Sequence, residues 1–375
     1  MDGGASAADG VEESGYAIEP DELELDGFDW DDLLTGPEAG SGQSGREERE
    51  GPARSRVASV RRAAWARFDR IVAGAAPAGR FSNPWRADGR ERRYLPDYET
   101  LARLLDVPLT LRPGEVQPSQ TGVPALALDV WIAYELRRAG FDPDAVWPRA
   151  SEPRILPAAL VGLLEHLPVQ QREAVRERLQ RSGPIAGATG STAHVLGRTT
   201  RRQVEVVLSD WTTGPEILVS TKRMDSSYGK NAANRIEEAY GDVRGLRSRH
   251  PLAATGFVLG LRSEVLDEPD RFEWLADMLA KLGDGRDAYH ATCLVMIEYG
   301  EPPAPAALPE AACLGLGPFG EGVAAGREVR VRMDLVPRAL SAERFFETLI
   351  DRVFRSTPVD MHAPARARRR RADGG

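Results

Sequence analysis

Two short apolar segments carry polar side chains of the types that hydrolyse phosphate esters. The first, residues 204–208, contains Glu205. The second, residues 217–221, contains Ser220 and is followed by Lys222. A carboxylate can hold Mg²⁺, which generates hydroxide and neutralises the charge that builds on phosphorus. A lysine amine can position or deprotonate the attacking water, or stabilise the transition state. These residue types predict metal-assisted hydrolysis of a phosphodiester.

The turn between the two segments decides which polar groups can meet. Both segments favour strands, in which side chains alternate between the two faces. Directly opposed residues of an antiparallel pair share a face. A turn centred at residues 213–214 sets Glu205 opposite Lys222. With that register Glu205, Ser220 and Lys222 converge on one face of a hairpin, and a slip by one residue would separate them.

Glu205 followed by a turn and then by residues 219–222 (Val-Ser-Thr-Lys) resembles the core of the PD-(D/E)xK nuclease superfamily. In that family an acidic residue on one strand precedes an acid-x-lysine triplet on the next. This sequence departs from the pattern at two places: Val204 and Glu205 stand where Pro-Asp is usual, and Ser220 stands where the second acid belongs. The resemblance implies a restriction-endonuclease-like fold and Mg²⁺-dependent cleavage of double-stranded DNA.

Some type II restriction enzymes in that family carry Ser-x-Lys and take the missing carboxylate from a Glu on the following helix. Here that helix offers Glu237 and Glu238. Ile236, Tyr240 and Val243 define its apolar face at helical spacing. Glu237 then lies at the edge of that face and Glu238 nearly opposite it. We therefore expect Glu205 and Glu237 to bind the metal and Glu238 to point to water.

Asp210 is the alternative to Glu205 as the first acid, because Ser209-Asp210 superficially resembles the Pro-Asp pair. The alternation of side chains places Asp210 on the other face of the strand, and it falls at the turn. These two facts favour Glu205.

The loop and helix after the second strand are rich in donors for phosphate. Residues 223–231 carry hydroxyl, amide and basic groups and lead into a helix N-terminus, which favours anions. Contacts from Arg223, Lys230 and Arg235 to DNA phosphates are expected.

Apolar periodicity places these residues in a larger arrangement. Helices are expected at 57–73, 98–105, 125–139, 157–166, 169–181, 231–248, 271–282 and 342–354. Strands are expected at 204–208, 217–221, 291–298 and 327–336. Segment 255–261 could form either a strand or a helix. The sequence therefore predicts a disordered acidic tail (1–55), a mainly helical recognition or dimerisation region (56–185), a nuclease-like α/β (α+β) domain with a central mixed sheet flanked by helices (186–360), and a disordered basic tail (361–375).

Charge is distributed unevenly along the chain. The 375 residues have a formal net charge of -8, yet residues 1–50 hold sixteen Asp and Glu against two Arg, so the remainder is basic. A basic surface permits binding to nucleic acid.

The segment 23–34 interleaves acidic and bulky apolar residues, which suits a solubilising tail, a segment that folds on a partner, or a mimic of nucleic acid. The apolar runs are too short to span a membrane and two cysteines are typical of a reducing compartment, so we expect a cytoplasmic protein.

These observations favour a Mg²⁺-dependent endonuclease acting on double-stranded DNA in restriction or antiphage defence. Cuts in both strands favour a homodimer, and the resemblance implies a cognate methyltransferase or another defence protein as partner. The alternative is a DNA-binding or defence-complex subunit that keeps a nuclease-like fold without a competent site, and Ser220 is the residue that raises it. In a third interpretation the acidic tail is the functional element and binds a partner protein.

Overall fold

The computed structural model describes residues 52–89, 91–111, 121–181, 185, 189–190, 192–226, 228–284, 288–300 and 328–371. The expected acidic tail lies outside the described residues, apart from 52–55, which begin helix α2 (Pro52–Ala75). Residues 50–375 form one compact unit. None of the helices among the described residues is long and apolar enough to cross a membrane.

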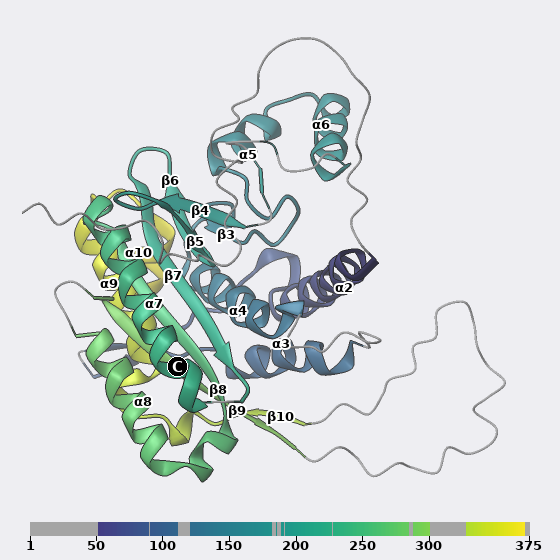
Figure 1. The fold of residues 1–375 in the computed structure, drawn as a ribbon. Coiled ribbons are helices and arrows are strands. Elements are labelled where there is room, and N and C mark those ends of the chain that lie inside the picture. The colour runs from purple at the N-terminus through teal and green to yellow at the C-terminus, as the bar shows by residue number, and fades with distance from the viewer. Residues whose placement is uncertain are drawn as a thin grey trace, which may run out of the picture. The chain divides into compact units, whose positions relative to one another are not determined.

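A six-stranded mixed sheet lies at the centre of the fold, flanked by helices, as the sequence predicts (Figure 1). The order across it is β10 (Val329–Val331), β9 (Ala291–Tyr299), β8 (Ala254–Arg262), β7 (Gly214–Met224), β6 (Val206–Asp210) and β3 (Val146–Trp147). Strands β7, β8 and β9 are parallel, and β3, β6 and β10 run antiparallel to their neighbours. Segment 255–261, open between helix and strand in the sequence, is the middle of β8, and its residues are buried on both faces, as is usual for a parallel strand.

Helices cover the two faces of this sheet with different partners (Figure 1). On one face α2, α3 (Tyr98–Thr110), α4 (Val123–Ala139) and α9 (Ala342–Ser356) share a core with the sheet. On the other face α7 (Tyr228–Arg249) and α8 (Pro269–Leu282) form a second core. Val258 belongs to the first core and Phe257 to the second, because side chains alternate along β8.

The smaller elements lie around this centre. The sequence predicts helices α5 (Ala158–Glu165) and α6 (Val169–Arg181) closely. It misses two antiparallel ribbons, β1 (Trp85–Asp88) with β2 (Glu91–Tyr94) and β4 (Ala193–Leu196) with β5 (Arg201–Val204). The strand expected at 327–336 is shorter, because β10 ends at Val331 and a 3₁₀ turn, Met333–Leu335, follows.

The carboxyl-terminal segment differs from the expected disordered basic tail, because Ala363–Arg370 form helix α10. Arg368 Nη1 donates to the carbonyl of Arg138 at 2.9 Å, close to the end of α4. Arg366 Nη2 donates to the carbonyl of Phe354 at 3.1 Å, at the end of α9. A run of arginines looks like a solvated tail in the sequence, but guanidinium groups can also satisfy the unpaired carbonyls at helix ends.

A buried ionic network holds α4 in place against its neighbours. Glu135 is fully buried and ion-pairs with Arg138, with 2.7 Å between Oε2 and Nη1. Its oxygens also accept hydrogen bonds from the Tyr94 hydroxyl (2.9 Å) and the Asp97 amide (2.7 Å). The same helix presents Asp129 to the sheet, so this network fixes the position of that side chain.

Replacing Glu135 with Ala should destabilise the protein strongly, because Arg138 would keep a buried charge without its partner. We expect a loss of about 3–5 kcal/mol in the free energy of unfolding, measured by denaturant titration. The control is Asp88→Ala, which removes an exposed ion pair with Arg93 and should cost less than about 1 kcal/mol. Equal losses in the two variants would contradict the role given to Glu135.

Candidate functional site

Glu205 lies at the point where strand β6 leaves its neighbour β7. The ladder between them runs from Val206, opposite Val219, towards the turn. At Glu205 the chain bends, and its Oε2 accepts a hydrogen bond from the Thr221 amide at 3.3 Å. The carboxylate therefore takes the place of a ladder partner and lies against the backbone of β7.

The register of this hairpin differs from the predicted one. The sequence predicts Glu205 opposite Lys222. Extending the observed pairing by one residue beyond Val206 places Glu205 opposite Ser220 instead. The cause is the turn: the chain reverses over three residues, Gly214 adopts a positive φ of 73°, and a bulge follows Leu208. The shift is two residues, an even number, so the face expected for Glu205 is still that of Ser220 and Lys222.

Helix α4 brings a second carboxylate to the same place, Asp129, which the sequence reasoning missed. Asp129 is 8% exposed, and its Oδ1 accepts a hydrogen bond from the Thr221 hydroxyl. Thr221 therefore holds both acids, Asp129 through its hydroxyl and Glu205 through its amide. A lone acid within the apolar run of α4 was the signal available in the sequence.

Burial and mutual repulsion make these two acids poor at ionising. Burial raises the pKa of Asp129, the nearby Glu205 raises it further, and Thr221, Arg61 and Lys222 act to lower it, leaving the pKa at about 8. Burial likewise raises the pKa of Glu205, against the opposing effect of Lys222. Two carboxyl groups in one water-poor place favour the binding of a cation between them.

Lys222 meets α7 through Glu238, which is exposed, as the sequence predicts. Lys222 Nζ lies 3.3 Å from Glu238 Oε1. Glu237, which the sequence suggests as a metal ligand, is exposed as well. The sequence counted Tyr240 in the apolar face, but it is 42% exposed, and the buried side includes Ala239 instead. Without Tyr240, the centre of the apolar face of α7 lies further around the helix from Glu237.

A short chain of charges extends from Lys222 along α7. Glu238 also pairs with Arg235, and Asp242, one turn further on, pairs with Arg202 at 3.0 Å. Burial acts to raise the pKa of Glu238, but Lys222 and Arg235 together hold it below its ordinary value. Glu238 is therefore ionised at neutral pH and suited to hold the ammonium group of Lys222 in position.

Ser220 is buried on the Lys222 side of β7 and lies beside Tyr289. Burial raises the pKa of Tyr289 above its ordinary value, and the carboxylates of Asp242, Glu205 and Glu238 add to this rise. Ser220 thus lines the site, while the second carboxylate comes from Asp129 on the other side of the strand.

The remaining predicted residues lie elsewhere. Asp210 is paired with Gly214 at the turn and accepts hydrogen bonds from Thr212, at the end of β7 remote from Lys222. Arg223 has a side chain 5% exposed and ion-pairs with Asp225 at 2.8 Å, which gives it a structural role rather than one in phosphate binding. Arg235 is half exposed. The side chain of Lys230 lies outside the described residues.

The donor set limits the kind of metal site. Within the described part of the chain no group of three or more His, Cys, Asp or Glu side chains could hold a metal ion. Mg²⁺ in enzymes is commonly held by one or two carboxylates, with water and substrate phosphate as the other ligands. Asp129 and Glu205 fit that kind of site.

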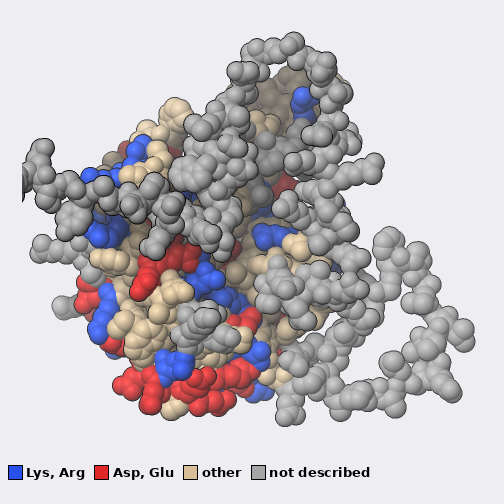
Figure 2. Space-filling model, in the orientation of Figure 1, with Lys and Arg blue, Asp and Glu red and all other residues tan. Residues whose placement is uncertain are grey.

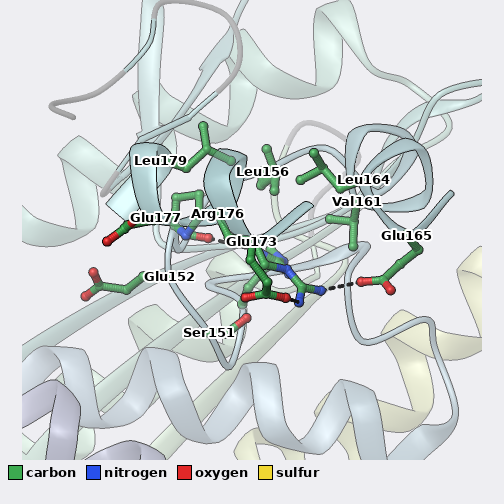
Figure 3. A pocket seen from close by; sticks show the side chains of 12 residues that line it. Ser151, Glu152, Leu156, Val161, Leu164, Glu165, Glu173, Arg176, Glu177 and Leu179 are labelled. Atoms are coloured by element: carbon green, nitrogen blue, oxygen red, sulfur yellow. Dashed lines mark hydrogen bonds and ion pairs between the residues drawn. The ribbon is translucent and has the colours of Figure 1, made fainter. Parts of the chain in front are cut away.

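A hollow of about 390 Å³ between α5, α6 and the segment before them offers a different set of groups (Figure 3). Arg176 reaches between Glu165 and Glu173 and pairs with both, and Glu152 pairs with Arg154. These charged groups neutralise one another, so we do not place the functional site here.

The buried carboxyl of Asp129 allows a stability test without metal. In the fold its pKa is raised, whereas in the unfolded chain it is about 4, so the folded state holds a proton that the unfolded state releases. Folding stability therefore falls as the pH rises between about 4 and 8.

Asp129→Asn keeps an acceptor for Thr221 and cannot ionise. In EDTA its melting temperature should be close to wild type at pH 5 and higher, by about 3 °C or more, at pH 8. A difference that does not change with pH would contradict the raised pKa.

No family model matches the chain, and no curated protein or solved structure matches it. The interpretation of the site therefore depends on its geometry: the buried carboxyl group of Asp129, the partly buried one of Glu205 and a lysine around β7.

Proposed function

We propose that this protein is a metal-dependent endonuclease that hydrolyses phosphodiester bonds of double-stranded DNA, in restriction or antiphage defence. The observation that carries the proposal is the placement of Asp129 and Glu205 on one residue of β7, with Lys222 directly after that residue. The strand–turn–strand–helix order of β6, β7 and α7 supports it, because it is the order of elements that the sequence resemblance implies.

Asp129 and Glu205 are the residues that would hold Mg²⁺. When bound, the ion supplies hydroxide at neutral pH and neutralises charge on the phosphoryl oxygens. It would also lower the pKa of both carboxyl groups, because a nearby cation favours their ionised forms. Glu237, which the sequence suggested as a ligand, is replaced in this proposal by Asp129.

Lys222 is the residue that would act on the reacting atoms. Its amine can orient the attacking water and donate hydrogen bonds to the phosphoryl oxygens as the bond to the leaving oxygen breaks. Glu238 restrains this amine through the 3.3 Å ion pair. Ser220 lines the same side of the strand and can donate a hydrogen bond to substrate or water.

A second candidate function is a DNA-binding or defence-complex subunit that keeps this fold without cutting. Two observations favour it: Ser220 occupies the place of an acid, and the described residues hold no cluster of three metal-ligating side chains. Such a protein would bind duplex DNA and leave it intact.

Cleavage by site variants tests the proposal. Plasmid and phage DNA of varied sequence is incubated with the full-length protein and Mg²⁺ or Mn²⁺, and strand breaks are quantified on gels. Lys222→Ala, Glu205→Gln and Asp129→Asn should each lower the cleavage rate at least about 100-fold, because each removes a group that stabilises the transition state.

Glu237→Gln is the matched control, since the exposed Glu237 should not contribute, and it should cleave like wild type. Unchanged cleavage by Lys222→Ala would refute the assigned site. Wild-type protein that binds duplex DNA without cutting it in either metal would favour the second candidate function.

A further inference from the structure

A hollow of about 620 Å³ lies between the turn that joins β4 to β5 and the second half of α7. Its lining is strongly basic, with guanidinium groups from Arg198, Arg202, Arg244 and Arg247. The hydroxyls of Thr199 and Ser248 add further donors. We call this hollow the arginine groove. The surface over α8 has the opposite charge, because acidic side chains gather there, at the bottom of the view in Figure 2.

Close backbone packing gives the groove its shape. The Arg198 amide donates to the carbonyl of Gly245 at 3.0 Å, which brings the β4–β5 turn directly onto α7. A Cβ at Gly197 would lie 3.2 Å from the Thr200 carbonyl oxygen and 3.4 Å from Gly245, so the approach is tight. At Gly241, by contrast, a Cβ would meet nothing within 4 Å, and the helix surface is open there.

Two of the four guanidinium groups in the groove, those of Arg198 and Arg244, form no ion pair with the described residues. Arg202 pairs with Asp242 at 3.0 Å, and Arg247 donates to the carbonyl of Ala288. The exposed guanidinium of Arg198 has no ion pair or hydrogen bond with another described side chain, and that of Arg244 lies over the Tyr240 ring, 5.8 Å from its centroid. The groove therefore presents charged donors to an anion from outside the protein.

The position of the groove relative to the candidate site points to one kind of anion. Asp242, which pairs with the groove residue Arg202, is four residues from Glu238, which pairs with Lys222. Arg244 lies six residues past Glu238, a rise of about 9 Å along α7. A nucleic-acid strand rises about 3.4 Å per nucleotide, so two or three nucleotides span that rise along α7.

We propose that the arginine groove binds the phosphodiester backbone of the nucleic-acid strand that passes through the candidate site, with Arg198 and Arg244 as its principal phosphate contacts. The inference rests on the proposed function and adds the path of the substrate. The sequence suggested Arg223, Lys230 and Arg235 for this role. The arginines of the groove are different residues, on the β4–β5 turn and in the second half of α7.

Binding is tested in EDTA, where a metal-dependent enzyme cannot cut. The probe is a fluorescein-labelled duplex of about 30 base pairs, titrated with full-length protein at several salt concentrations. The Arg198→Gln/Arg244→Gln double variant should bind at least about tenfold more weakly than wild type. The slope of log affinity against log salt should fall by about 2, because each lost phosphate contact lowers it by about 0.9.

Two controls keep the test specific. Arg271→Gln/Arg330→Gln removes the same charge from α8 and β10 and should bind within about twofold of wild type. Gly241→Glu places a carboxylate on the open floor of the groove and should weaken binding, whereas Gly241→Gln, of the same size, should weaken it much less. Neither Gly241 variant meets a steric obstacle, so both should fold.

Each outcome bears on the inference separately from the proposed function. Unchanged affinity and salt slope in the Arg198/Arg244 double variant would overturn it, as would equal losses in the two double variants. Binding of tripolyphosphate in the groove without binding of duplex DNA would also overturn it. If the double variant loses binding while wild type never cuts DNA, the groove stands and the endonuclease proposal fails.

Discussion

The candidate site depends on two carboxylates, the buried Asp129 and the partly buried Glu205, that lie against one residue of β7. Taking a carboxylate out of water costs several kcal/mol unless hydrogen bonds or a cation compensate, and two together repel each other. Thr221 compensates in part, since its hydroxyl bonds Asp129 and its amide bonds Glu205. Lys222 supplies positive charge nearby. The negative charge that these groups leave uncompensated favours the binding of a divalent cation. This is the physical basis for proposing metal-dependent chemistry at this place.

The rest of the fold brings these groups together from distant parts of the sequence. The buried Glu135–Arg138 network fixes α4 and so the position of Asp129. The bend just before β6 frees Glu205 from the ladder, and β7 is paired on both sides, with β6 and with β8. Helix α7 then links the site to the arginine groove through alternating charges, from Lys222 to Glu238 and from Asp242 to Arg202.

The sequence predicts the architecture better than it predicts the site. Apolar periodicity is enough to place the central strands and most helices, because each buried face repeats at its own spacing. It cannot place Asp129, because the contact with Thr221 joins residues 92 positions apart. It places Glu237 too close to the buried face of α7, because an exposed tyrosine, Tyr240, looks like a core residue in the helical pattern. It also misses the docking of α10, where arginines bond carbonyls that only the folded chain presents.

The most direct measurement of the central claim is a crystal structure of the protein soaked with Mn²⁺, located by its anomalous scattering. The account predicts an ion bound to carboxylate oxygens of both Asp129 and Glu205, at about 2.0–2.5 Å, with Lys222 beside it. An ion held elsewhere, or a site that stays empty while both carboxyl groups remain bound to Thr221, would contradict it.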